Sequence, residues 1–106
     1  MTGEEFVKLC RKEKDSMMQI YFTEDSGSEA SRIINDMVQT GTNKEDLYRL
    51  INTVLTDTYY TLLLGIDGAC SLGDKQIIYK LYDDESNLLN ECGEIEESAY
   101  SCFIEN

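Results

Sequence analysis

The residues best suited to chemistry in this chain are the carboxylates of its C-terminal quarter. Beyond Lys80 the sequence carries many acidic side chains and no further Lys or Arg. Carboxylates can form a general acid–base pair, hold a hard cation, or present charge to a cationic surface. The candidate residues are Asp83, Asp84, Glu85, Glu91, Glu94, Glu96 and Glu97.

Acid–base catalysis needs a carboxylate pair whose pKa values are pushed apart by burial. Asp83, Asp84 and Glu85 belong to the polar stretch DDESN, which predicts an exposed turn where desolvation is slight. The chain has no His, so the usual general base near neutral pH and the Ser–His and Cys–His nucleophile pairs are missing. We therefore expect no catalytic residues and no enzyme activity.

Metal binding is the second possibility. Oxygen-bearing residues match positions 1, 3, 5, 9 and 12 of the calcium-loop template, namely Asp83, Glu85, Asn87, Glu91 and Glu94. The template requires Gly at position 6 for a sharp turn, and this chain has Leu88 there. The cysteines are too widely separated for a zinc site. We predict a solvated acidic turn with no metal and no cofactor.

Two tyrosines precede the acidic turn. The sequence KQIIYKLYD places Tyr79 and Tyr82 in a stretch that leads directly into Asp83. Tyrosine is enriched at protein interfaces because its ring supplies apolar contact while its hydroxyl forms hydrogen bonds. Together with the carboxylates, these residues predict a mixed aromatic and acidic surface, whose natural complement is a basic protein surface.

Three N-terminal helices are expected to position this surface. Capping boxes begin at Thr2, Ser26 and Thr42. In this motif the Ser or Thr hydroxyl accepts a hydrogen bond from the backbone N–H three residues later, and the Glu at that position bonds to the backbone N–H of the Ser or Thr. Apolar residues recur at helical spacing after each box. Gly41 stands where a left-handed cap should end the second helix.

The third helix has the longest apolar stripe, which runs from Leu47 to Leu62 over about five turns. The run TYYTLLLGI, residues 58–66, is compatible with the buried end of a helix or with a buried strand. We favour a helix to about Leu64 that ends at Gly65.

A small hairpin and a final helix complete the expected fold. Residues 75–83 are rich in β-branched and aromatic side chains and predict a strand, with Leu88 and Leu89 returning as its antiparallel partner. After Gly93 the apolar spacing and the acidic first turn predict a C-terminal helix. The expected class is α+β, dominated by helices, in a single globular domain at residues 1–106.

Composition limits the partners. The chain has 106 residues, 42% of them apolar, and a formal net charge of −12. This charge disfavours direct binding of nucleic acid or of an anionic membrane. The N-terminus lacks the basic-then-apolar order of a secretion signal, and no apolar run approaches the roughly 20 residues of a membrane span. We expect a cytoplasmic protein.

The stretch YYTLLLGIDGACSLGDKQIIYKLYDDESNLL, residues 59–89, resembles bacterial immunity proteins of polymorphic-toxin and contact-dependent growth inhibition systems. The similarity lies in size, acidity and the layout of helix, Gly-rich turn and strand. It implies a cytoplasmic protein that binds and neutralises one cognate toxin domain, often a basic nuclease. These proteins share no catalytic motif, so the resemblance assigns no site residue by position.

Two alternatives stay open from the sequence. One is a regulatory interaction module, a homodimer that buries the TYYTLLL segment and whose association therefore survives high salt. The other is a DNA mimic that occupies the nucleic-acid groove of a host protein. The DNA mimic would use the same electrostatics as an immunity protein against a different target. The chain itself is expected to be a monomer or a homodimer.

Overall fold

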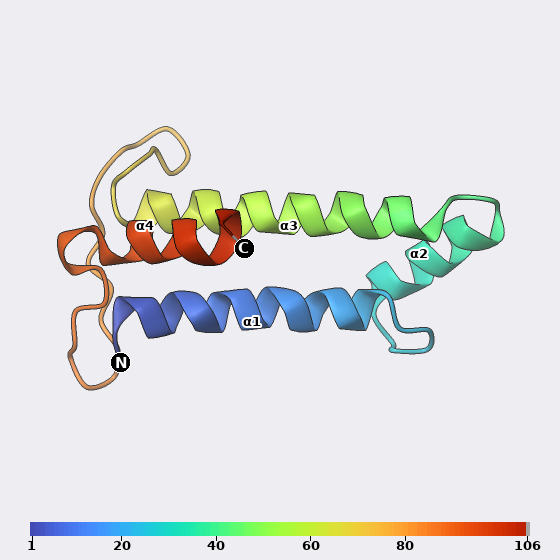
Figure 1. Ribbon diagram of the computed structural model, residues 1–106, viewed down its shortest axis with the longest axis horizontal. Helices are drawn as coiled ribbons and strands as arrows, with labels where there is room; N and C mark the ends of the chain where they lie inside the picture. The colour runs from blue at the N-terminus through green and yellow to red at the C-terminus, as the bar shows by residue number, and fades with distance from the viewer. Residues whose placement is uncertain (106) are drawn as a thin grey trace.

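The computed structural model describes residues 1–105 of the chain. Its principal helices are α1 (Gly3–Tyr21), α2 (Glu29–Gln39), α3 (Lys44–Ile66) and α4 (Glu94–Ala99). Helices α1 and α3 run side by side along the long axis, α4 packs against both at one end, and α2 lies at the other end (Figure 1). A 3₁₀ turn, Glu91–Gly93, leads into α4, and a π-helical turn, Tyr100–Ile104, continues it.

The predicted start of α1 is confirmed, whereas that of α2 is shifted. The Thr2 hydroxyl accepts a hydrogen bond from the backbone N–H of Glu5 at 3.1 Å. The cap of α2 is Ser28 and not Ser26. The Ser26 hydroxyl instead donates to the carbonyl of Ile20 at 2.8 Å, so this side chain helps to close the end of α1.

The start of α3 is shifted for a similar reason. Its cap is Asn43, whose side chain accepts from the backbone N–H of Asp46 at 3.0 Å. The backbone N–H of Thr42, the predicted cap, donates to the Met37 carbonyl at 2.9 Å and so belongs to the end of α2. Gly41 has φ +108°, which confirms the predicted left-handed cap of α2.

Gly65 does not end α3. The helix continues to Ile66, and the chain reverses at Gly68, where φ is +76° and the backbone N–H donates to the Gly65 carbonyl at 3.2 Å. A Cβ at Gly65 would lie 3.2 Å from the Cβ of Leu72. The glycine therefore lets the connection after the helix pack closely against the helix surface.

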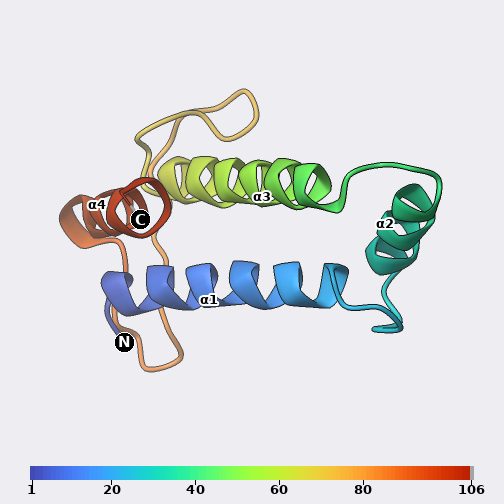
Figure 2. The same cartoon turned by 45° about the vertical axis from the view of Figure 1, so that its right-hand side comes forward.

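The predicted antiparallel hairpin is wrong. Within residues 1–105 the structure contains no strand, only isolated bridges that join Leu72 to Lys75 and Tyr82 to Leu88. The α+β class is therefore corrected to an all-helical fold with a long connector at residues 67–90. Figure 2 shows this connector looping out from the end of α3 before it returns past α1 and α4.

The β-prone segment fails to form a sheet because its backbone groups bond elsewhere. The N–H of Tyr79 donates to the carbonyl of Ile66 at 3.0 Å, and the N–H of Leu81 donates to Asn90 Oδ1 at 2.9 Å. The Asn90 amide donates in turn to the Tyr79 carbonyl. The Asn90 side chain thus makes the hydrogen bonds that a neighbouring strand would make. The isolated bridge between Tyr82 and Leu88 is too short to form a sheet.

The core lies at the end of the molecule where α1, α3 and α4 meet. The Phe103 ring stacks on that of Tyr59 with centroids 5.9 Å apart. At the other end, the rings of Phe22 and Tyr48 join α1 to α3 with centroids 5.0 Å apart. The buried residues of the core cluster are Val7, Leu63, Ile95, Ala99 and Phe103.

The molecule is elongated, with extents of 48 × 29 × 24 Å. Its radius of gyration is 16.3 Å, against about 13 Å for a compact domain of similar length. Large apolar side chains therefore remain exposed on α1, α2 and α3. None of the described helices, however, combines the length and the apolarity needed to cross a membrane.

Candidate binding surface

The turn at residues 83–87 is organised by the carboxylate of Asp83. Its Oδ1 accepts from the backbone N–H groups of Glu85 and Asn87, each at 2.9 Å. Its Oδ2 accepts from the Asn87 side-chain amide at 3.0 Å and from the N-terminal amino group of Met1 at 3.2 Å. The Asp83 side chain is only 13% exposed. This carboxylate holds the turn and the N-terminus together.

These bonds change the proton affinities of both groups. Hydrogen bonds from the Asn87 side chain and backbone, with those from Met1 and Glu85, hold the pKa of Asp83 well below its usual value. The same contact raises the pKa of the Met1 amino group, because its hydrogen bond to Asp83 favours the charged form. Both groups are therefore charged at neutral pH and neutralise each other.

Glu94 is placed at the N-terminus of α1. Its Oε1 accepts from the backbone N–H of Glu4 at 3.4 Å, where the helix dipole favours a negative charge. Gly3 lets both the connector and Glu94 come close to the start of α1, because a Cβ there would lie 2.0 Å from the carbonyl oxygen of Leu89 and 3.0 Å from Glu94 Cγ. The acidic first turn of α1, Glu4 and Glu5, is thereby brought next to the C-terminal carboxylates.

The start of α4 is fixed by a sharp reversal and by a side chain from α3. Cys92 and Gly93 have positive φ values of 53° and 76°, which turn the chain into the helix. Asp67 Oδ2 accepts from the backbone N–H of Glu96 at 2.7 Å and so ties α4 to the end of α3. Glu97 of the same helix lines a groove of about 300 Å³ together with Lys8 of α1.

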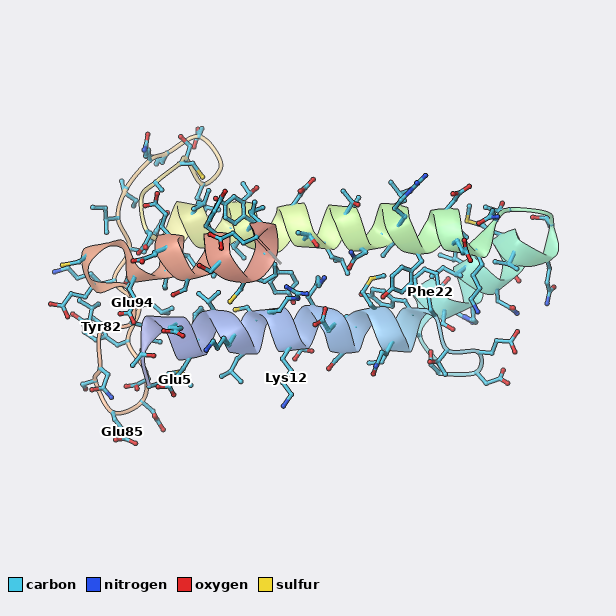
Figure 3. The ribbon with its side chains drawn as sticks, viewed as in Figure 1. Glu5, Lys12, Phe22, Tyr82, Glu85 and Glu94 are labelled. Atoms are coloured by element: carbon cyan, nitrogen blue, oxygen red, sulfur yellow. The ribbon has the colours of Figure 1, made fainter. Side chains whose placement is uncertain are left out.

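The tyrosines and the remaining carboxylates are displayed outward. Tyr79 and Tyr82 are exposed although the backbone between them is held by Asn90. Figure 3 shows Tyr82, Glu85, Glu94 and Glu5 at the same end of the molecule, with Lys12 farther along α1. Within the described residues, several exposed carboxylates have no ion pair or side-chain hydrogen bond: Asp84, Glu85, Glu91, Glu96 and Glu97.

The predicted site residues thus divide into two groups. Asp83 and Glu94 accept hydrogen bonds from the N-terminal segment, while the others are exposed. We use the name acidic end for Tyr79, Tyr82, Asp84, Glu85, Glu91, Glu94, Glu96 and Glu97 together with Glu4 and Glu5.

Within residues 1–105, ion pairs with basic side chains offset little of the charge of the acidic end, although Lys80 is exposed next to Tyr79. Arg11 lies 3.3 Å from Asp15, and Arg49 lies 3.5 Å from Asp46. Arg32 is likewise paired within its own helix. Lys8 is 2.9 Å from Glu4 and is the one paired lysine that touches the acidic end within residues 1–105. The carboxylates beyond Lys80 thus have few basic ion-pair partners in the described residues.

Glu4 and Glu5 were missed as members of this surface. Their acidity was visible in the capping box at the start of α1, but their position beside Glu94 depends on a contact between the two ends of the chain. In the described part of the chain, no group of three or more His, Cys, Asp or Glu side chains could hold a metal ion.

No protein-family model matches the sequence, and no curated protein and no solved structure matches the chain. The geometry and charge of residues 1–105 therefore carry the functional proposal.

Proposed function

We propose that this protein binds a cationic protein partner through the acidic end, and that it acts as an immunity protein that neutralises a cognate toxin domain. The observation that carries the proposal is the group of exposed carboxylates that have no ion pair within residues 1–105, together with exposed Tyr79 and Tyr82. Their mutual repulsion opposes compactness, and a basic partner surface would relieve it.

Charge and aromatic contact have separate roles in such a complex. The carboxylates attract the partner over distances of about 10 Å or less at ordinary ionic strength and accelerate association. Tyr79 and Tyr82 supply contact area that loses water on binding and governs the lifetime of the complex. A toxin domain that binds nucleic acid carries Lys and Arg for phosphate contacts, so the acidic end would cover the same groups.

The backbone around the tyrosines suits this role because it is already ordered. Asn90 is buried and bonds to the backbone of both Tyr79 and Leu81. A binding loop held in place before association loses less conformational entropy when the partner docks.

Charge reversal in the acidic turn tests the proposal. We expect Asp84→Lys with Glu85→Lys to slow association with a cognate basic toxin domain by about tenfold or more, and to reduce its salt dependence. Asp83 is left intact because it holds the N-terminus. Stopped-flow association at several salt concentrations measures both effects.

The matched control reverses two exposed acids elsewhere, Glu24→Lys with Asp36→Lys, which changes the net charge equally. If both double variants slow association to the same extent, only net charge matters and the acidic end is not the binding surface. If neither slows association, the proposal fails. A third arm, Tyr82→Ala, should leave the association rate unchanged and raise the dissociation rate by about tenfold.

A further inference from the structure

Lys14 is a charged residue on the buried face of α1. It is only 4% exposed, and it shares that face with Val7 and Met18, which are buried on the same helix. Replacement of a buried ion pair by apolar side chains of similar size is often neutral or stabilising. Packing alone therefore does not explain a lysine at this position.

The Lys14 side chain lines a polar cleft between α1 and α3, which we call the α1–α3 cleft. Its volume is about 220 Å³. Pockets for drug-sized ligands measure about 300–1,000 Å³, so this cleft suits a smaller molecule. Its polar lining comes from Arg11 and Lys14 of α1 and from Asn52, Thr53, Thr56 and Asp57 of α3.

The two cations of the cleft have unused N–H donors. The Lys14 ammonium donates to Asn52 Oδ1 at 2.8 Å and lies 3.3 Å from Asp15 Oδ1. Arg11 donates to the Asp15 carboxylate at 3.3 Å and to the Cys102 carbonyl. An ammonium group carries three N–H donors and a guanidinium group five. Both side chains therefore keep donors that have no acceptor among residues 1–105.

The Asp57 carboxylate lines the same cleft and has no ion pair or hydrogen bond within the described residues. It belongs to α3, whereas Arg11 and Lys14 belong to α1. These two cations, with Asp57 and the Asp15 carboxylate that contacts both, have a formal charge of zero in total. Separated charges that sum to zero favour a zwitterion over a simple anion or cation.

We propose that the α1–α3 cleft binds a free α-amino acid. The carboxylate of the ligand accepts hydrogen bonds from Lys14 and Arg11, and its ammonium group donates to Asp57. The ring of Phe103, which also lines the cleft, supplies an apolar contact. None of the lining residues belongs to the acidic end, so this site does not depend on the proposed function.

Truncated ligands test the need for both charges. L-alanine is compared with propionate, which lacks the ammonium group, and with ethylamine, which lacks the carboxylate. L-leucine is compared in the same way with isocaproate and isoamylamine. Each truncated ligand leaves a charged side chain of the cleft without its partner, so we expect it to bind at least about tenfold more weakly than its amino acid.

Binding is measured by titration of the NMR signals of residues that line the cleft. The proposal is overturned if neither amino acid shifts these signals at millimolar concentration. It is also overturned if the amino acid that binds is matched in affinity by its own carboxylate or amine.

Substitution of Lys14 tests the carboxylate end of the site. Lys14→Met keeps the length of the side chain and removes the charge, and it should weaken amino-acid binding by about tenfold or more. The control is Lys12→Met, because Lys12 is exposed on the same helix and makes no ion pair within residues 1–105. Circular dichroism checks that both variants fold. Equal affinities of the two variants would overturn the proposal.

Substitution of Asp57 tests the ammonium end and also decides the question if Lys14→Met does not fold, because Asp57 is exposed. Asp57→Asn should weaken binding of the amino acid by about tenfold and leave the matched carboxylate bound as before or more tightly, since a repulsive charge is removed. An equal loss for both ligands, or no loss for the amino acid, would overturn the proposal.

Discussion

The helical frame and the connector at residues 67–90 are held together by different forces. In the frame, Val7, Leu63 and Ile95 are almost completely buried, and apolar contact joins α1, α3 and α4. In the connector, Leu81 and Leu89 supply the main apolar contacts, and Asn90 and the turn around Asp83 supply polar ones. The difference shows that the connector part of the acidic end, Tyr79, Tyr82, Asp84 and Glu85, is displayed by a segment whose shape depends largely on a few hydrogen bonds.

The stability of the fold is therefore expected to depend mainly on the frame, and the shape of the binding surface mainly on the connector. Loss of apolar contact in the frame should affect the whole fold, because burial contributes most of the folding free energy. Loss of one polar contact in the connector should change the local structure of the acidic end and leave the frame intact.

The largest effect is expected in the frame. Ile95→Ala should lower the free energy of unfolding by about 2–5 kcal/mol, since it empties a fully buried site between α1 and α4. Urea denaturation followed by circular dichroism measures the change. Ile33→Ala, at an exposed position on α2, is the control and should have an effect within about 0.5 kcal/mol. Equal effects at the two sites would remove the distinction between core and surface.

A smaller and local effect is expected from Asn90→Ala. This change removes the hydrogen bonds to Leu81 and Tyr79 and should cost about 1–3 kcal/mol, because it leaves partly buried backbone groups unpaired. Hydrogen exchange should show faster exchange at residues 77–83 with little change in α1 and α3. Uniformly faster exchange throughout the chain would mean that frame and connector form one cooperative unit.

The smallest effect is a pH dependence of the Asp83–Met1 contact. The pKa of Asp83 is lowered from its usual value of 3.8, so its stabilising contribution is present above that pH and is lost as the pH falls. The pKa of the Met1 amino group is raised from 8.0, so its contribution is present below that pH and is lost as the pH rises past the raised value.

Asp83→Asn should therefore lower the stability by the same amount throughout the range between these limits, and it should flatten the pH profile of unfolding below pH 3.8 and above pH 8.0, where the contact is lost. Its control is Asp84→Asn, because Asp84 is exposed and accepts no hydrogen bond within the described residues. Urea midpoints measured between these limits and also below pH 3.8 and above pH 8.0 test the difference. Identical profiles for Asp83→Asn and the unchanged protein would mean that the contact does not stabilise the fold in solution.

Local signals predicted the helices well and the connector poorly. The cap at Thr2 and the left-handed residue Gly41 were identified because capping involves residues only a few positions apart. The strand prediction for residues 75–83 was wrong because β propensity needs a neighbouring strand and a buried face. Asn90 supplied the hydrogen bonds instead, and Ile77 and Ile78 remained exposed.

The same limit applies to the helix faces. Periodicity identified the apolar stripe of α3, but Leu50 and Val54 of that stripe are exposed while Leu47 is buried. A wide apolar stripe predicts that one face of a helix is buried. It does not predict which residues of the stripe are covered by the rest of the chain.

The sequence by itself determined the acidity of the C-terminal quarter, the polarity of charge along the chain and the positions of the main helices. These properties follow from composition and from interactions within a few residues. Only the tertiary structure decided that Asp83 pairs with Met1, that Glu4 lies beside Glu94, and which carboxylates have no ion pair among residues 1–105. The reason is that hydrogen bonds and charge pairs act between atoms close in space, and the fold brings together residues from the two ends of the chain.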